Sequence, residues 1–188
     1  MADPLRERTE RLLTDYLQYC AREPEPGAPE PPPSTPEAAV LRAAATRLRR
    51  RHWAFFSRYI GYQGNRVELM ARMAEATFSD NRGLNWGRVV TLAAFAGTLL
   101  ERGPSVVAEW KTRHEVARDC PRLVALLCAR LVGQHRAWLE AQGGWDGFCQ
   151  FFRTPLPLTF WRRRLIWTFL SCFLATALMY FWTQLHKF

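Results

Sequence analysis

A largely apolar stretch between Arg88 and Glu101 limits the possible folds of this chain more than any other feature, because it contains no charged residue. A helix that is apolar on every face must be wrapped on all sides by other elements. Asn85 is a favourable N-cap, and Gly103 followed by Pro104 is a typical helix end. We therefore predict an all-α bundle of helices around a central helix from Asn85 to Gly103. Its apolar residues are Val89, Val90, Leu92, Ala93, Ala94, Phe95, Ala96, Leu99 and Leu100.

Three amphipathic segments precede the central helix. The first begins at Asp3-Pro4, a cap followed by a first-turn proline, and its apolar stripe is Leu5, Leu12, Leu13, Tyr16, Leu17 and Cys20. The second begins with a capping-box pattern, Ser34 to Glu37, and continues through Leu41, Ala45, Leu48, His52, Phe55 or Phe56, and Tyr59. The third is capped by Asn65 with Glu68 and carries Val67, Leu69, Met70, Met73 and Phe78.

Arginines on the second segment fall largely off its apolar face, which predicts a solvated basic surface. They are Arg47, Arg50, Arg51 and Arg58.

Pro121 leaves two possibilities open for the next apolar helix, whose stripe is Val116, Leu123, Leu127 and Leu131. Either the helix starts at Pro121 with Asp119 as its cap, or it passes through Pro121 with a kink. The glycines between Gly133 and Gly147 predict short pieces from there to Phe152.

The prolines concentrate in residues 23–36, which hold seven of them and three glutamates. Such a segment cannot bury a core, so we predict a flexible linker inside a helical domain of residues 1–153. A short stiff spacer, residues 154–160, follows that domain.

Residues 161–188 form a terminal apolar segment, in which Leu165 to Leu185 contains 21 residues without a charge. About 20 apolar residues span the hydrocarbon layer of a membrane. Three arginines, 162–164, precede the run, and Trp and Tyr residues lie at both ends, so its N-terminal side should face the cytosol. We predict a C-terminal transmembrane anchor; a buried helical hairpin partner is the alternative.

Charge and reactive side chains exclude several functional classes. Residues 41–188 carry a net charge of +13, which suits anionic lipid or nucleic acid, but no basic run interleaved with aromatics appears in a polar loop, so no nucleic-acid partner is expected. The five cysteines are scattered, which predicts free thiols in a reducing compartment. Neither metal-ligand spacing nor a catalytic constellation appears, so we expect no enzyme activity, no metal and no cofactor.

Two short motifs resemble those of a known family. Asn85-Trp86-Gly87-Arg88, followed about fifty residues later by the stretch from Trp138 to Phe148, is similar to the first and second homology motifs of the B-cell lymphoma 2 family of apoptosis regulators. The start Arg6-Glu7-Arg8-Thr9 and the segment from Gly143 to Cys149 are similar to one particular member. The resemblance covers nearly the whole chain.

This resemblance implies a bundle of about eight helices with a surface groove that receives an amphipathic helix from a pro-apoptotic family member. Gly87 would let that helix approach closely, and Arg88 would offer a planar fork to its aspartate. The implied binding residues are Asn85, Gly87, Arg88, Val89, Leu48, Phe56, Met70, Met73 and Leu92.

A third homology motif of the family is incomplete here. Leu41 and Ala45 fit it, but Thr46 stands where the family has an aspartate. This favours a groove wall over a death ligand and weakens self-association through helix exchange. The leading hypothesis is a membrane-tethered, anti-apoptotic receptor; the alternative is a pore former that inserts its two apolar helices. The mitochondrial outer membrane is the expected location, with the endoplasmic reticulum or nuclear envelope as alternatives.

Overall fold

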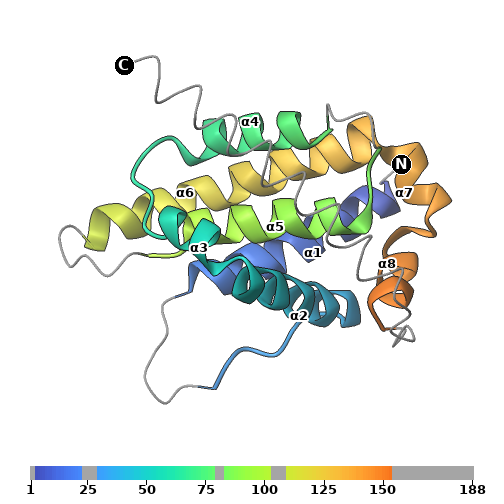
Figure 1. The fold of residues 1–188 in the computed structure, drawn as a ribbon, viewed down its shortest axis with the longest axis horizontal. Helices are drawn as coiled ribbons and strands as arrows, with labels where there is room; N and C mark the ends of the chain where they lie inside the picture. Colours follow the sequence, from blue (N-terminus) through green and yellow to red (C-terminus); the bar gives the residue numbers. More distant parts are fainter. Residues whose placement is uncertain (1–2, 23–28, 79–82, 103–108, 154–188) are drawn as a thin grey trace. The chain divides into compact units, whose positions relative to one another are not determined.

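The computed structural model describes residues 3–22, 29–78, 83–102 and 109–153, which form eight α-helices and no strand (Figure 1). All of them belong to one compact unit, Met1–Arg153. The helices are α1 (Pro4–Ala21), α2 (Pro36–Arg51), α3 (Trp53–Phe56), α4 (Arg66–Phe78), α5 (Trp86–Leu100), α6 (Glu109–Cys128), α7 (Arg136–Ala141) and α8 (Gly144–Arg153). A 3₁₀ turn, η1 (Ser57–Tyr59), follows α3, and a π-helical segment, η2 (Ala129–Gln134), follows α6. The all-α prediction is confirmed.

The predicted central helix is α5, which packs against α1, α2, α4 and α6 (Figure 1). Its residues are buried except Gly87 and Arg88, as the uncharged sequence requires. The Asn85 side chain caps the helix by accepting a hydrogen bond from the Arg88 N–H at 3.0 Å. The predicted end at Gly103 is wrong, because α5 stops at Leu100 and the backbone of Glu101 is already extended.

Gly97 allows α1 to approach α5 closely. A Cβ atom at this position would lie 2.6 Å from the Cys20 sulfur and 3.1 Å from the Tyr16 ring, both on α1. Helix α1 itself begins where predicted, with Asp3 accepting hydrogen bonds from the Leu5 and Arg6 N–H groups. Burial raises the pKa of the Cys20 thiol to about 12, so this cysteine is a packing residue.

The second segment differs from its prediction at both ends. Its cap is Thr35, which accepts a hydrogen bond from the Ala38 N–H, while the Glu37 side chain binds Arg8 on α1 at 2.6 Å. The single helix expected to continue to Tyr59 instead ends at Arg51, and α3 begins at Trp53 after a break at His52. Three arginines in the last turn of α2 suit the negative end of the helix dipole.

A buried arginine ties α4 to α5 and α6. Arg66 is 3% exposed; it donates from Nε to the Leu99 carbonyl at 2.9 Å and from Nη1 to Asp119 at 3.2 Å. The first possibility for Pro121 is therefore wrong: α6 passes through Pro121, and Asp119 pairs with Arg66 instead of capping a helix. The cap of α4 is as predicted, since Asn65 accepts a hydrogen bond from the Glu68 N–H.

None of the helices formed by residues 3–22, 29–78, 83–102 and 109–153 is both long and apolar enough to cross a membrane. The predicted spacer and transmembrane anchor, residues 154–188, lie outside the described residues, as does the part of the proline-rich linker from 23 to 28.

Candidate functional site

The first turn of α5 places the polar residues of the predicted groove together. Gly87 is exposed and Arg88 is half-buried, while the side chain of Asn85 is held by its capping bond. A Cβ atom added at Gly87 would lie 3.1 Å from Asn85 Oδ1, a tight contact, and nothing else crowds it. The backbone of this turn is therefore open to close approach from outside.

The side chain of Arg88, in the first turn of α5, reaches the end of α4 and the residues just before α5. Its Nη1 donates to the Thr77 carbonyl oxygen at 3.2 Å and to the Gly83 carbonyl oxygen at 2.7 Å. The Thr77 carbonyl is in the last turn of α4, where carbonyl groups lack intrahelical partners. The guanidinium therefore joins two elements of the predicted groove.

The two sequence motifs meet through their tryptophans. Trp86, between Asn85 and Gly87, is buried, and its ring lies 4.8 Å from that of Trp138, 5.8 Å from that of Trp145 and 5.2 Å from that of Phe148. Edge-to-face and tilted contacts of this kind are favourable for aromatic rings. The second motif, carried by α7 and α8, thus supports the first turn of α5 from inside the protein.

Helix α8 is in turn fastened to α1 and α2. The Trp145 Nε1 donates to Thr9 Oγ1 at 2.8 Å, a buried contact. Arg8 binds Asp146 through two hydrogen bonds of 2.8 and 2.7 Å, and binds Glu37 as well. Burial would raise the pKa of the Glu37 carboxyl, but hydrogen bonds from its own backbone N–H and from Arg8 outweigh burial and lower the pKa.

The predicted apolar groove residues lie on α5 and on the helices around it, and most of them are buried. Phe56, Met70, Met73, Val89 and Leu92 are buried, and Leu48 is half-buried. They come from α2, α3, α4 and α5, and α5 packs against both α2 and α4.

Sequence reasoning missed two contributors to this region. Phe95 of α5 was assigned only to the core and Tyr59 only to a helix stripe, yet their rings lie 5.0 Å apart edge to face, with Phe55 against both. A period of three or four residues places them on buried faces but does not show which rings meet.

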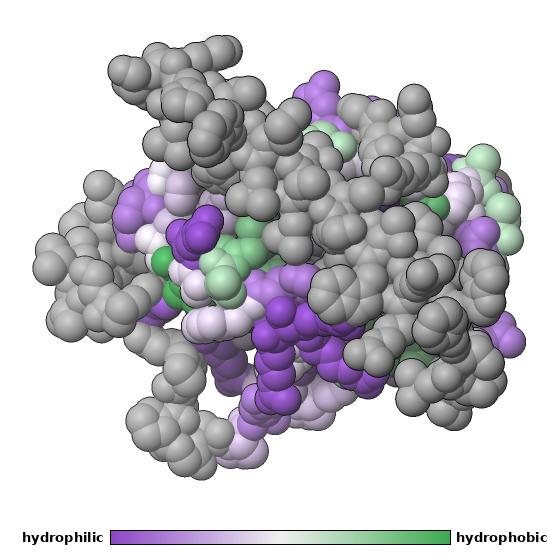
Figure 2. All heavy atoms as spheres, viewed as in Figure 1, coloured by the Kyte–Doolittle hydropathy of each residue, from purple (hydrophilic) through white to green (hydrophobic). Residues whose placement is uncertain are grey.

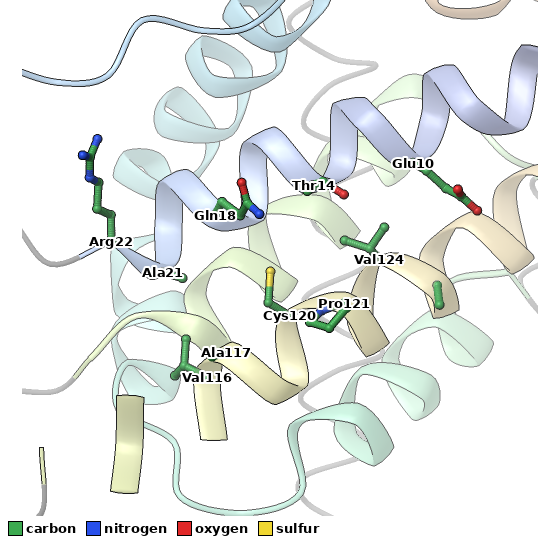
Figure 3. Close-up of a pocket in the computed structure, with 11 residues that line it drawn as sticks. Glu10, Thr14, Gln18, Ala21, Arg22, Val116, Ala117, Cys120, Pro121 and Val124 are labelled. Carbon is green, nitrogen blue, oxygen red and sulfur yellow. The ribbon is translucent and has the colours of Figure 1, made fainter. Parts of the chain in front are cut away.

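A cavity of about 690 Å³ lies elsewhere, between α1 and α6 (Figure 3). Its lining includes Gln18 of α1 and Val116, Cys120 and Val124 of α6, and none of the predicted groove residues. No sequence motif marks it. Among the residues that the structure describes, no three His, Cys, Asp or Glu side chains are placed to hold a metal ion.

Comparisons with known proteins agree with this arrangement. Residues 41–145 match the sequence model of the apoptosis regulator proteins of the Bcl-2 family. The chain is 67% identical to human Bcl-2-like protein 10, over 98% of this chain and 95% of that one. It is 37% identical to the anti-apoptotic protein NR13 of Coturnix japonica, over 81% of this chain and 80% of that one.

A solved structure adds a bound state of a similar protein. The crystal structure of the zebrafish pro-survival protein NRZ in complex with the Bad BH3 is 27% identical in sequence, with a TM-score of 0.62. The match covers 79% of this chain and 95% of that one.

Proposed function

The chain belongs to the Bcl-2 family of apoptosis regulators, and from this premise we propose that it is an anti-apoptotic receptor for the amphipathic helices of pro-apoptotic partners. The partner helix would lie across the first turn of α5. The observation that carries the proposal is the exposed Gly87 beside the half-buried Arg88, on a turn that Trp86 anchors to α7 and α8.

The chemistry of this turn suits a helix that bears an acid. Gly87 leaves its backbone uncovered, and Arg88 carries a planar guanidinium that matches a carboxylate. The Thr77 and Gly83 carbonyls hold Nη1 of Arg88 at this edge, so the guanidinium is positioned before a ligand arrives. Preorganisation of this kind lowers the entropic cost of binding.

The names of related proteins support an anti-apoptotic rather than a pro-apoptotic activity. NR13 is described as anti-apoptotic and NRZ as pro-survival, and the latter has been crystallised with the Bad BH3. The exposed Thr46 on α2, where an acid would be needed for α2 to act as a ligand itself, agrees with a receptor. Leu41 and Ala45 of that helix are buried in the core.

Binding is tested by titrating residues 1–153 with a panel of BH3 peptides, including that of Bad, by calorimetry. We expect saturable binding at a stoichiometry of one peptide per chain. Absence of binding by a folded protein, or release of dye from anionic liposomes by the protein alone, would contradict the receptor and favour a pore former.

We further propose that residues 161–188 anchor the protein in an intracellular membrane, the mitochondrial outer membrane first, with residues 154–160 as a spacer. The support is the uncharged run from Leu165 to Leu185 and the arginines before it. Truncation after Arg153 should release the protein into the cytosol on fractionation. Carbonate-resistant membrane association of the truncated protein would contradict the anchor.

A further inference from the structure

The stretch between Glu37 and Glu68 contains seven arginines and no acidic residue. It comprises α2, α3, η1 and the start of α4. Such a stretch either neutralises acids elsewhere in the fold or presents unbalanced positive charge to the solvent. In the structure, some of these arginines pair with acids of other helices and others are exposed to solvent.

Two arginines of α2 have acidic partners in the fold. Arg42 binds Asp15 of α1 at 2.7 Å, and Arg49 is paired with Glu101 after α5. Both arginines are half-buried, and their partners lie on α1 and just after α5, so these pairs fasten α2 to its neighbours. They leave these two acids occupied, so neither is available to balance further charge on α2.

Three other arginines, Arg47, Arg50 and Arg58, are exposed, and no ion pair joins them to an acid within the described residues. Arg47 and Arg50 are three residues apart on α2 and therefore lie on one face of that helix. In Figure 2, hydrophilic residues gather over α2 in this view. This face is a source of positive charge.

Trp53 adds an aromatic ring to this charge. It is the first residue of α3, which follows α2 after the break at His52, and it is 56% exposed. A tryptophan is costly to expose to water, and it is enriched where proteins meet the headgroup layer of membranes. We call Arg47, Arg50, Trp53 and Arg58 the basic aromatic surface.

We propose that the basic aromatic surface docks the helical domain onto an anionic phospholipid membrane, with the arginines on the headgroup phosphates and Trp53 in the interfacial layer. Arginine side chains near an anionic leaflet contribute additively to attachment, and an interfacial aromatic ring adds a term that does not depend on charge. One exposed ring close in sequence to three exposed arginines suits a charged, partly apolar membrane surface. Nucleic acid would favour several aromatic platforms along a groove.

The contact is separate from the proposed tail anchor. On α2 the apolar residues Leu41 and Ala45 are buried, whereas Arg47 and Arg50 are exposed. Docking through this surface would fix the orientation of the helical domain on the membrane.

The test uses the full chain in vesicles made with brominated lipids, which quench nearby tryptophans. Since the chain has eight tryptophans, the contribution of Trp53 is the difference between the wild type and Trp53→Phe. We expect Trp53 to be quenched in vesicles containing phosphatidylserine and not in pure phosphatidylcholine, with the effect reduced by high salt.

Two triple variants separate this surface from net charge. Arg47→Gln/Arg50→Gln/Arg58→Gln should abolish the quenching of Trp53, because attachment should weaken roughly fivefold for each arginine and about a hundredfold for all three. The matched control is Arg11→Gln/Arg122→Gln/Arg153→Gln, three exposed arginines on α1, α6 and α8, which should leave the quenching unchanged. The tail is the same in every variant.

An equal loss of Trp53 quenching in the two triple variants would overturn the proposal. So would quenching of Trp53 that is the same in anionic and in neutral vesicles. So would a labelled single-stranded oligonucleotide whose binding depends on Arg47, Arg50 and Arg58 while the quenching in vesicles does not. Circular dichroism of each variant establishes that it is folded.

Discussion

Trp145 on α8 donates its indole N–H to the hydroxyl oxygen of Thr9 on α1, at 2.8 Å and out of contact with water. The Thr9 hydroxyl in turn donates a hydrogen bond to the Leu5 carbonyl oxygen at 2.7 Å. The same indole ring packs against Trp86, the residue before Gly87. One side chain thus links the end of the helical domain to its first helix and to the candidate binding turn.

Trp145→Phe should destabilise residues 1–153 by roughly 1–3 kcal/mol, because the Thr9 hydroxyl loses its donor while the phenyl ring leaves part of the indole volume empty. Urea unfolding followed by circular dichroism measures the loss. Trp138→Phe is the control, since Trp138 is only half-buried and should cost less. A larger loss at Trp138 would contradict the ranking.

Gly147→Ala should prevent α7 and α8 from joining as they do. A Cβ atom there would lie 1.7 Å from the Gln142 carbonyl oxygen, so the backbone of the turn has to move. We expect a loss of at least about 2 kcal/mol in the free energy of unfolding. Gly133→Ala is the matched control: a Cβ atom there meets nothing within 4 Å, and alanine should be neutral or stabilising by about 0.5–1 kcal/mol. Equal effects at both glycines would disprove the steric argument.

Acid should weaken the contact between α1 and α2 through Glu37. Its pKa is lowered from the ordinary value of 4.5, burial being outweighed by hydrogen bonds from its own N–H and from Arg8. A carboxyl with a lowered pKa in the folded state contributes its full stability above 4.5, and loses it as the pH falls through the lowered value. The free energy of unfolding of the wild type should therefore fall more steeply with acid than that of Glu37→Gln.

Denaturant unfolding at several pH values between neutral and strongly acidic measures this difference. Glu7→Gln, which removes an exposed acid of α1, controls for the loss of one negative charge. A stability difference between the wild type and Glu37→Gln that stays constant across the acid range would contradict the role of Glu37.

The helical architecture could be predicted from local signals, because helix caps and the three-to-four-residue spacing of apolar side chains depend on residues that are close in sequence. Asp3, Asn65 and Asn85 all cap the helices that the sequence assigned to them. The missed boundaries depend on interactions that are distant in sequence. Glu101 is paired with Arg49, and Asp119 binds Arg66 instead of capping a helix at Pro121.

The sequence motif locates the candidate site on α5, but not the contacts that support it. The motif from Asn85 to Arg88 marks the first turn of α5, yet only the fold shows that Trp86 meets Trp138 and Phe148. A single sequence does not specify which of eight tryptophans pack together. The carbonyl partners of Arg88 are equally hidden, because backbone acceptors have no residue signature.

We expect Arg88 to decide whether the first turn of α5 recognises the acid of a partner helix. Burial of aliphatic side chains should supply most of the affinity, at roughly 1.5–3 kcal/mol for each, and the ion pair should fix the register. Truncating one member of a hydrogen-bonded charge pair costs on the order of 2–5 kcal/mol, and less where water reaches the pair. Arg88→Ala should therefore weaken binding by at least about tenfold. Gly87→Glu should be worse, because it adds bulk and opposing charge at the exposed turn.

The most direct test is a double-mutant cycle by calorimetry, with Arg88→Ala in residues 1–153 and the aspartate of a Bad BH3 peptide replaced by alanine. We expect that, once Arg88 is gone, replacing the aspartate adds little further loss, which gives a coupling energy of about 1 kcal/mol or more. Circular dichroism must show that Arg88→Ala is folded. Additive losses in that folded variant would show that Arg88 does not meet the ligand's acid, and would contradict the proposed groove.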